Sequence, residues 1–514
     1  MKKKLTNFVL FLLIAVLCLV GCGNKDVQSG GGNQAITIDW LPQNDDVVNK
    51  ESPIVKKYEE MLGVNFNFIY LDRNKMTELL NMRIASNQIP DVMRLSKDMY
   101  QAYLKQGVLT PYSEATLKTN APELYKITRE NTWDSLWEDL KQNGNLYGIP
   151  TLNMQGRYPF VPIWRDDWLK NVGINKIPET LEEAEEAFYK FVNNDPDKNG
   201  QKDTYAISDK GFNAIYGAFG TQEYGIWLEN GGKLSYTLTM PEMKEALTLL
   251  HKWYKDGIID PEFITGESKG QYWANSVPFC NGKIGFSVPG MYYHISSGEQ
   301  TESESNNYKT FKELQGGNAT YTAGVPLTGP TGKSGTYKWG VYTGNYVVIG
   351  KNAAKTEGKI EKILQVHEKV NSDFDFFKLV IMGIENEDYT FDGNYYNRAP
   401  FANRGMTAAQ AGLNTNGIAF LQNNFEFGSA LAKKDIEYAE KVAGFDGYVN
   451  KVWVGLPSTG QFSSILESKA KEAIVLFITG QRDLSEFDEY VEEMNVSGLS
   501  QLTKEANEWY VTVK

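Results

Sequence analysis

The sequence predicts an α/β protein, and three observations lead to this prediction. Segments with the alternating pattern of strands and segments with the 3.6-residue pattern of helices follow one another from residue 35 onward. The chain has 514 residues, which is enough for two or three domains or for one two-lobed unit. It holds only three cysteines, so the fold must be supported by hydrophobic cores and not by a disulfide framework.

The first part of the chain indicates a parallel sheet. A strand–helix–strand order implies parallel neighbours joined by right-handed crossovers. In such open sheets ligands bind beyond the carboxyl ends of the strands, which places residues 41–46 and 96–99 at a binding edge. The predicted elements are strands over 35–40, 64–70 and 91–95 and helices over 52–62, opened by Ser52-Pro53, and 74–86.

The second part begins near Pro150 and contains well-marked helices. Thr180 is the predicted N-cap of a helix with an acidic first turn. Pro241 opens another helix, which ends at Asp256-Gly257. The segment 335–350 is strand-like and is expected to carry the chain back toward the first part. Further predictions are a strand over 204–208 and helical segments over 354–382, 427–442 and 461–477.

The first residues predict export and lipid anchoring. Three lysines precede an apolar run over residues 8–20, which is too short for an ordinary membrane span and is typical of a secretory signal. The run ends in Leu-Val-Gly-Cys22, which resembles the bacterial lipobox, so Cys22 is the predicted lipid attachment site. Residues 23–33 have the composition of a flexible tether. The alternative, an uncleaved anchor helix, predicts the same location at the extracytoplasmic face of the membrane.

Composition excludes several classes of function. The formal net charge of −12 argues against a nucleic-acid partner, which would need a concentrated basic surface. Three histidines and three cysteines cannot build a four-ligand zinc site unless distant residues converge. Cys280 is expected to be a small buried residue and not a nucleophile. An acidic chain with 13% aromatic residues is suited to holding an uncharged, flat ligand.

Several short motifs occur in an order that resembles a known family. They are Ser-Asn-Gln-Ile-Pro-Asp-Val (86–92), Asn-Leu-Tyr-Gly-Ile-Pro (145–150), Ile-Trp-Arg-Asp-Asp-Trp-Leu (163–169), Trp-Tyr-Lys-Asp-Gly-Ile-Ile-Asp-Pro-Glu (253–262), Asn-Gly-Lys-Ile-Gly (281–285) and Phe-Ile-Thr-Gly (477–480) followed by Leu-Ser-Glu-Phe-Asp (484–488). The set resembles the family 1 extracellular solute-binding proteins of bacterial ABC importers. The resemblance is greatest to large lipoproteins that carry oligosaccharides, such as alginate- or glycosaminoglycan-oligosaccharide-binding members.

This resemblance implies a two-lobed, periplasmic-binding-protein-like fold with a hinge between the lobes. It also implies a monomer that binds an oligosaccharide and delivers it to the transmembrane subunits of a permease. Ile149-Pro150-Thr151 would be the first crossing between lobes. The expected organisation is a signal peptide (1–21), a lipidated tether (22–34), the N-terminal part of the first lobe (35–150), the second lobe (151–335), and hinge crossings with C-terminal helices that complete both lobes (336–514).

One loop has the spacing of a calcium site. Asp195, Asp197, Asn199 and Asp203 occupy positions 1, 3, 5 and 9 of an EF-hand-like loop with glycine at position 6. Position 12 is Ala206 where an EF-hand has glutamate. Similar loops in oligosaccharide-binding relatives imply a structural Ca²⁺ remote from the ligand, held by those four side chains and the backbone carbonyl of Gln201. The alternative is an acidic surface turn without a metal.

The ligand site is predicted from residue types. Sugars present flat C–H faces and hydroxyl rims, so their sites combine aromatic rings with polar side chains. If the arginines converge, they could hold the carboxylate or sulfate of an acidic saccharide. The candidates, chosen near strand ends and lobe crossings, are Trp40, Gln43, Asn44, Asp45, Gln155, Arg157, Tyr158, Trp273, Tyr292, Tyr293, Tyr395, Arg398 and Arg404.

Two other classes of function stay open at this point. A secreted glycoside hydrolase would also be acidic and aromatic-rich, and a pair of carboxylates among 64 acidic residues could be catalytic. The sequence carries no phosphate-binding glycine loop and no G-x-S-x-G motif, and we expect no enzymatic activity. A peptide-binding importer component is the second alternative, because the fold alone does not choose the ligand.

Overall fold

A computed structural model describes residues 35–43, 46–297, 304–393, 405–413, 417–418 and 433–513, together with the backbone of 396–398. By its contacts the chain from Ile36 to Lys514 forms one unit. The predictions for residues 1–34, which include Cys22, lie outside the described residues.

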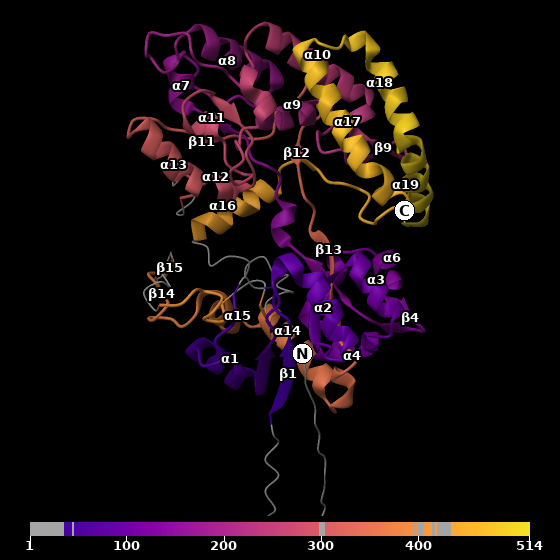
Figure 1. The fold of residues 1–514 in the computed structure, drawn as a ribbon. Coiled ribbons are helices and arrows are strands. Elements are labelled where there is room, and N and C mark those ends of the chain that lie inside the picture. The colour runs from indigo at the N-terminus through magenta and orange to yellow at the C-terminus, as the bar shows by residue number, and fades with distance from the viewer. Residues whose placement is uncertain are drawn as a thin grey trace, which may run out of the picture. The chain divides into compact units, whose positions relative to one another are not determined.

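The first sheet has the predicted parallel strands at one edge. β1 (Ile36–Trp40) pairs in parallel with β2 (Val64–Phe68) and with β3 (Val92–Ser96). The next strand, β13 (Tyr342–Ile349), comes from much later in the chain and runs antiparallel to β3. β6 (Ile149–Leu152) completes the order β2-β1-β3-β13-β6. The segment predicted to return to the first part therefore does so as a central strand (Figure 1).

The helices between these strands begin and end where local chemistry predicts. Ser52 caps α1 (Pro53–Leu62), because its hydroxyl accepts a hydrogen bond from the backbone N–H of Ile54. The helix ends at Gly63, whose φ of 63° is in the left-handed region that favours glycine. The second crossover is a 3₁₀ turn (Arg73–Lys75) followed by α2 (Met76–Ala85).

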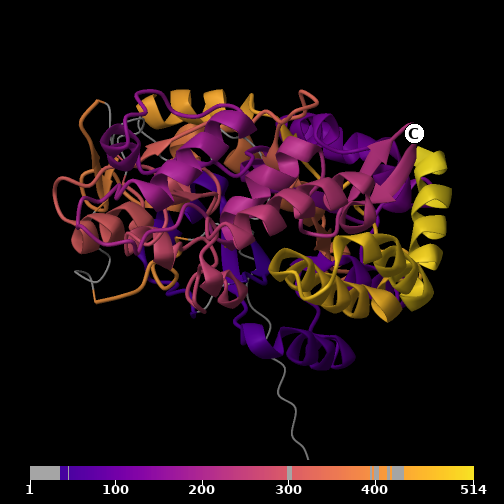
Figure 2. The same cartoon turned by 90° about the horizontal axis from the view of Figure 1, so that it is seen from above.

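A second set of elements surrounds a short antiparallel sheet. β7 (Ile163–Trp164) lies between β10 (Phe286–Ser287) and β11 (Thr322–Ala323). α8 (Leu181–Asn193) begins with a full capping box, in which Thr180 and Glu183 each bond the other's backbone N–H. α10 (Pro241–Lys255) ends as predicted before Asp256-Gly257 and packs beside α17 (Thr459–Thr479) in both views (Figures 1 and 2).

The remaining elements complete these two sets. They are α3 (Lys97–Lys105), α4 (Glu114–Asn120), α5 (Pro122–Glu130), α6 (Asp134–Asp139), β4 (Lys141–Gln142), β5 (Asn145–Leu146), α7 (Asp166–Asn171), α9 (Phe212–Phe219), β8 (Trp227–Asn230), β9 (Lys233–Tyr236), α11 (Val277–Cys280), α12 (Tyr292–Ile295), α13 (Asn306–Gln315), β12 (Thr336–Tyr337), α14 (Lys359–Ser372), α15 (Phe374–Met382), β14 (Tyr389–Phe391), β15 (Tyr396–Arg398), α16 (Lys433–Ala443), β16 (Gly447–Tyr448), α18 (Phe487–Met494) and α19 (Ser500–Val513).

Two hydrophobic cores result. The first core takes its buried residues from Ile38 to Ile149 and from Tyr346 to Ile418. The second core takes them from Tyr158 to Leu327 and from Tyr438 to Ala506. The chain therefore passes from the first core to the second after β6 and returns between β12 and β13. It passes to the second core again before α16, through residues that are in part outside the described set.

Two predicted elements differ in the structure. Residues 204–208 do not form a strand: Tyr205 and Ile207 each make a single bridge, to Ile284 and to Ile259. These partners belong to different segments, so no continuous ladder forms. The helical segment predicted over 354–382 is divided at Asp373, because the Asp373 carboxylate accepts from the backbone N–H of Phe376 and so caps α15 as a new helix.

Cys280 is buried, as predicted, and burial raises the pKa of its thiol to about 12. A thiol with this pKa is almost fully protonated at neutral pH and is a poor nucleophile.

Candidate ligand-binding site

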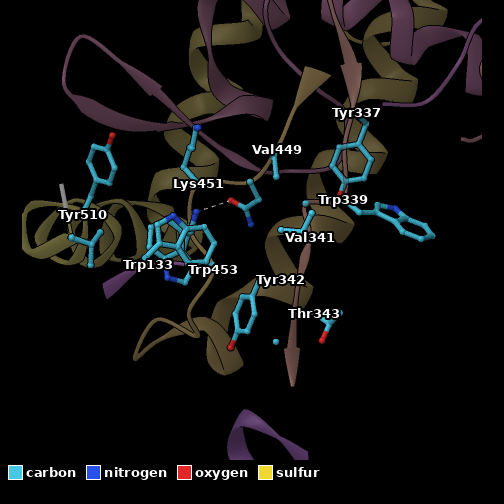
Figure 3. A pocket seen from close by; sticks show the side chains of 15 residues that line it. Trp133, Tyr337, Trp339, Val341, Tyr342, Thr343, Val449, Lys451, Trp453 and Tyr510 are labelled. Carbon is cyan, nitrogen blue, oxygen red and sulfur yellow. Dashed lines mark hydrogen bonds between the residues drawn. The ribbon is translucent and has the colours of Figure 1, made fainter. Parts of the chain in front are cut away.

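A cavity of about 600 Å³ lies beside the segment that connects β12 to β13 (Figure 3). This volume is within the range of small-molecule binding sites. Both cores contribute to its wall, since Trp133 and Tyr342 pack against the first core and Tyr337 and Tyr510 against the second. We call it the crossing cavity. Its lining residues are Trp133, Tyr337, Trp339, Gly340, Val341, Tyr342, Thr343, Gly344, Val449, Asn450, Lys451, Val452, Trp453, Tyr510 and Val513.

Two tryptophans in this wall are stacked on each other. The ring centroids of Trp133 and Trp453 are 3.6 Å apart and the rings are 8° from parallel. The ring centroid of Tyr342 is 6.1 Å from that of Trp133, and the ring centroid of Trp509, on α19, is 4.5 Å from that of Trp453. In both contacts the two rings are nearly perpendicular to each other. These two indoles therefore cover each other's inner faces.

A second group of rings adjoins the crossing cavity and shares Tyr337 and Trp339 with it. Trp339 lies 5.1 Å from Trp273, and Trp273 is stacked on Phe160 at 5.7 Å. Tyr224 lies 4.3 Å from Tyr337. We call the set Phe160, Tyr224, Tyr272, Trp273, Tyr337 and Trp339 the aromatic cluster. Three of its rings are well exposed: Tyr224 at 50%, Tyr272 at 56% and Trp339 at 41%.

Trp339 of the aromatic cluster and the stacked pair extend to different sides of the connecting segment. In Figure 3 the side chain of Trp339 points away from the stacked Trp133 and Trp453, with Val341 between them. The exposed rings of the aromatic cluster can receive a ligand face, whereas the stacked pair has no free face between its rings.

One buried carboxyl group, that of Glu267, links the loops on either side of Trp273. Glu267 accepts hydrogen bonds from the hydroxyls of Ser276 and Ser287 and from the backbone N–H of Lys210. Burial, followed by the nearby charge of Asp209, raises the pKa of Glu267 to about 8. The ammonium of Lys210 donates to the carbonyl of Trp273 at 2.5 Å. These hydrogen bonds hold the backbone at Trp273 in place.

The pKa of Glu223, which precedes the exposed Tyr224, is also raised. Burial and the charge of Asp209 raise its pKa to about 7, and Asn213 Nδ2 lies 3.4 Å from its Oε1.

Those predicted ligand residues that the structure describes are not gathered at one place. Trp273 belongs to the aromatic cluster, and Tyr293 lies beside it through His294. Trp40, Tyr158 and Tyr292 are 0–2% exposed and lie inside the two cores. The indole N–H of Trp40 donates to the carbonyl of Gly417.

Two of the polar candidates have side chains engaged by protein groups. Gln43 Nε2 donates to the Arg94 carbonyl. Gln155 lies half-buried in the 3₁₀ turn Met154–Arg157, where its backbone N–H donates to Asn153 Oδ1. Arg157 forms an ion pair with Glu440 at 2.5 Å and also hydrogen bonds the hydroxyl of Tyr158. Asn44, Asp45, Tyr395 and Arg404, and the side chain of Arg398, lie outside the described residues.

Sequence reasoning missed most of the cavity wall. Tyr337, Trp339 and Tyr342 fall in the strand-like segment 335–350, and aromatic residues in a segment expected to cross between lobes were a usable signal. Trp133 and Trp453 carried no such signal, since nothing local to either residue indicates the other.

The predicted calcium loop brings its acidic side chains near one another. Asn199 Nδ2 donates to Asp197 at 2.8 Å and to Asp203 at 3.2 Å. The backbone N–H groups of Asn199 and Gly200 donate to the carboxylate of Asp195 at 3.1 and 3.0 Å. Burial, together with the neighbouring carboxyl groups of Asp195 and Asp203, raises the pKa of Asp197. Within the described residues, no three His, Cys, Asp or Glu side chains converge closely enough to form a ready metal site.

In the part of the chain that the structure describes, no helix is both long enough and apolar enough to span a membrane.

The two cores, the antiparallel return of β13 into a parallel sheet, and the cavity at the crossing define a solute-binding class of two-lobed α/β protein. Residues 53–358 match the family described as bacterial extracellular solute-binding protein, and this chain belongs to that family. The resemblance found in the sequence motifs is thereby confirmed. The family's description and the names of YtcQ and FusA, two similar proteins, refer to solute or substrate binding.

Similar proteins cover the whole chain. Lipoprotein LipO of Bacillus subtilis is 25% identical over all of this chain and all of its own length. The polygalacturonan/rhamnogalacturonan-binding protein YtcQ of the same organism is 22% identical, over 98% of each chain. The structure of the Streptococcus pneumoniae ABC-transporter substrate-binding protein FusA in complex with kestose superposes with a TM-score of 0.58 at 17% identity, covering 93% of this chain and 99% of FusA. FusA has also been solved as an EF-hand mutant in complex with fructo-nystose.

Proposed function

We propose that this protein is the substrate-capture lipoprotein of an ABC importer and that its solute is an oligosaccharide. The observation that carries the proposal is the gathering of aromatic rings at the crossing between the cores, in a member of a solute-binding family. The names of YtcQ and FusA, which refer to polygalacturonan, rhamnogalacturonan and fructooligosaccharide, support the same class of solute.

The aromatic cluster has the chemistry that sugar faces require. The exposed rings of Tyr224, Tyr272 and Trp339 offer apolar faces for C–H surfaces of a pyranose or furanose ring. Hydroxyl groups of the sugar need donors and acceptors at the rim. The adjoining cavity offers the side-chain amide N–H groups of Asn450, whose Oδ1 already accepts from the backbone N–H groups of Trp227 and Val452. Among the described residues that line the cavity, Lys451 carries the one formal charge.

Three arginines were the predicted groups for holding the carboxylate or sulfate of an acidic saccharide. Arg157 is already paired with Glu440, so it offers little to a ligand carboxylate without first losing that partner. We therefore test neutral and acidic saccharides side by side.

Capture and delivery would use the passages of the chain between the cores. Of these passages, the structure describes the one after β6 and the one between β12 and β13. The two cores would close about these segments on a ligand and present the closed form to the permease. The lipid on Cys22 would keep the receptor at the extracytoplasmic face of the membrane, beside that permease.

A structural Ca²⁺ in the loop 195–203 is part of this proposal. The N–H end of the Asn199 amide already faces the carboxylates of Asp197 and Asp203, so the loop stabilises positive charge there. Asp195, Asp197, Asn199, the carbonyl of Gln201 and Asp203 would hold the ion, which suits hard oxygen donors. The ion would supply positive charge that relieves the repulsion among three neighbouring carboxylates.

Calorimetry on the mature chain tests the proposed function. Neutral fructooligosaccharides, oligogalacturonides and mixed peptides are titrated separately, and the saccharide solutions are analysed for fragments afterward. We expect saturable heat with one saccharide class and unchanged saccharides. Binding of peptides alone would overturn the proposal, and the release of saccharide fragments would indicate a glycoside hydrolase.

A further inference from the structure

The stacked pair of indoles in the wall of the crossing cavity carries a further inference. We propose that Trp133 and Trp453 clasp the two cores together and act as positioning residues, which set the affinity for the solute without contacting it. This inference rests on the proposed function for its affinity readout only, because the clasp itself can be tested without a ligand.

The geometry of the pair indicates a contact between rings and not a vacant sugar platform. At a centroid separation of 3.6 Å and an angle of 8°, the two rings are in van der Waals contact over their faces. A sugar ring cannot enter between them unless they first move apart. Each ring of the pair also has a near-perpendicular neighbour: Tyr342 contacts Trp133, and Trp509 contacts Trp453.

The two rings are anchored in different cores. Trp133 immediately precedes α6 and packs against the first core. Trp453 follows Val452, which is buried in the second core, and it contacts Trp509, which packs against that core. The stack is therefore a side-chain link between the cores, additional to the backbone segments that connect them.

This link favours the arrangement of cores in which the cavity exists. Stacking requires two nearly parallel rings at one separation, so a rotation of one core relative to the other breaks it. Residues of both cores line the cavity, so the same rotation also changes its wall. A contact present in one arrangement and absent in others shifts the population toward the first, and solute affinity rises with the competent fraction.

Affinity measurements distinguish positioning from direct contact. For Trp133→Ala and Trp453→Ala we expect an affinity loss of about three- to tenfold in calorimetry, which corresponds to the stacking energy of an aromatic pair. The double variant should lose no more than either single variant, because either change alone already breaks the stack. Trp453→Phe, which keeps a flat ring, should recover most of the affinity. If the two losses multiply in the double variant, each ring contacts the solute independently and the proposal is wrong.

A distance measurement tests the clasp in the ligand-free protein. Spin labels on cysteines introduced at Lys118 of α4 and Lys471 of α17, both exposed, report the separation of the cores. We expect a broader distance distribution in Trp453→Ala than in the wild type, and recovery in Trp453→Phe. Phe391→Ala is the matched control, since it removes a ring that is 44% exposed on β14, outside both groups of rings, and should leave the distribution unchanged.

The outcomes separate this inference from the proposed function. An unchanged distribution in a Trp453→Ala protein that keeps its circular dichroism spectrum would overturn the clasp, whatever the protein binds. A wild-type protein that binds no saccharide would overturn the proposed function and leave the distance result to decide the clasp. If Trp453→Ala does not fold, Trp133→Ala and the milder Trp453→Phe provide the same comparison.

Discussion

The indole of Trp273 lies 5.1 Å from that of Trp339, with the two rings tilted by 47°. One tryptophan comes from the loop before α11, and the other from the segment that connects β12 to β13. The backbone carbonyl of Trp273 accepts a hydrogen bond from the ammonium of Lys210, whereas Trp339 is 41% exposed. Together they form a ring surface that is supported on one side and open on the other, which is what a sugar platform needs.

Removing either ring should weaken saccharide binding. We expect Trp273→Ala and Trp339→Ala each to reduce affinity by about tenfold or more, because each removes stacking area worth about 1.4 kcal/mol. Titration calorimetry with the saccharide that binds the wild type provides the measurement. Phe391→Ala, which removes a ring that is 44% exposed on β14 and outside the aromatic cluster, serves as the control. Equal affinities for all three variants would show that the cluster does not contact the solute.

Local patterns were sufficient to predict most elements of the fold. The strand and helix periods gave β1, β2 and β3 in parallel order, and the Thr180–Glu183 capping box could be anticipated because it involves residues three positions apart. The same period of two also determines where the side chain of Trp40 lies. Trp40 shares its strand face with the buried Ile38, and this places its ring in the first core and not at the sheet edge.

The ring contacts at the crossing could not be predicted in this way. Trp133 and Trp453 meet only because two cores, built from interleaved parts of the chain, bring them together. A single sequence contains no local pattern that records such a long-range contact. Trp273 was predicted because an aromatic residue flanks the strand expected over 281–285, whereas its neighbour Trp339 is known only from the fold.

A buried ion pair at the first sheet should be important for stability. Asp91 is 2% exposed, and its carboxylate accepts from the backbone N–H of Asp39 at 2.8 Å and from the ammonium of Lys359 at 2.9 Å. Lys359→Met leaves this carboxylate buried without its cation, which costs about 3–5 kcal/mol in the free energy of unfolding. Urea denaturation measures this loss.

Two further variants check the cause of that loss. Lys362→Met, which removes a single hydrogen bond to the carbonyl of Leu62, should cost about 1 kcal/mol or less. Adding Asp91→Asn to Lys359→Met should recover part of the stability, because it removes the unpaired charge. A double variant as unstable as Lys359→Met would mean that the lost packing of the lysine stem, and not the charge, is responsible.

His367 should make the protein less stable in mild acid. Its ring is buried against Trp40, and neither nitrogen has a hydrogen-bond partner among the described residues. Burial lowers its pKa to about 3, against 6.5 for the free side chain. Between these values the unfolded chain binds a proton that the folded chain does not, so stability falls as the pH drops from about 6.5 toward 3.

The expected size is about 2 kcal/mol between pH 7 and pH 5, since each pH unit below the unfolded pKa contributes about 1.4 kcal/mol. His367→Leu has no proton to bind and should lose this part of the pH dependence, which urea denaturation at the two pH values would show. A His367→Leu protein with the same decline as the wild type would place the acid sensitivity in other groups.

Removal of calcium should destabilise the second core. Asp195, Asp197 and Asp203 lie on the loop that follows α8, whose residues Phe188 and Phe191 are buried in that core. A bound ion stabilises the folded chain by mass action, by about 2.7 kcal/mol at a concentration one hundred times its dissociation constant. A chelator should therefore lower the melting temperature by several degrees, and added Ca²⁺ should restore it.

Asp197→Asn should melt at the lower temperature with or without chelator, while Asp488→Asn, at an acidic residue that is 90% exposed on α18, should respond as the wild type does. A wild-type melting temperature that does not move with chelator would mean that the loop is an acidic turn without a metal.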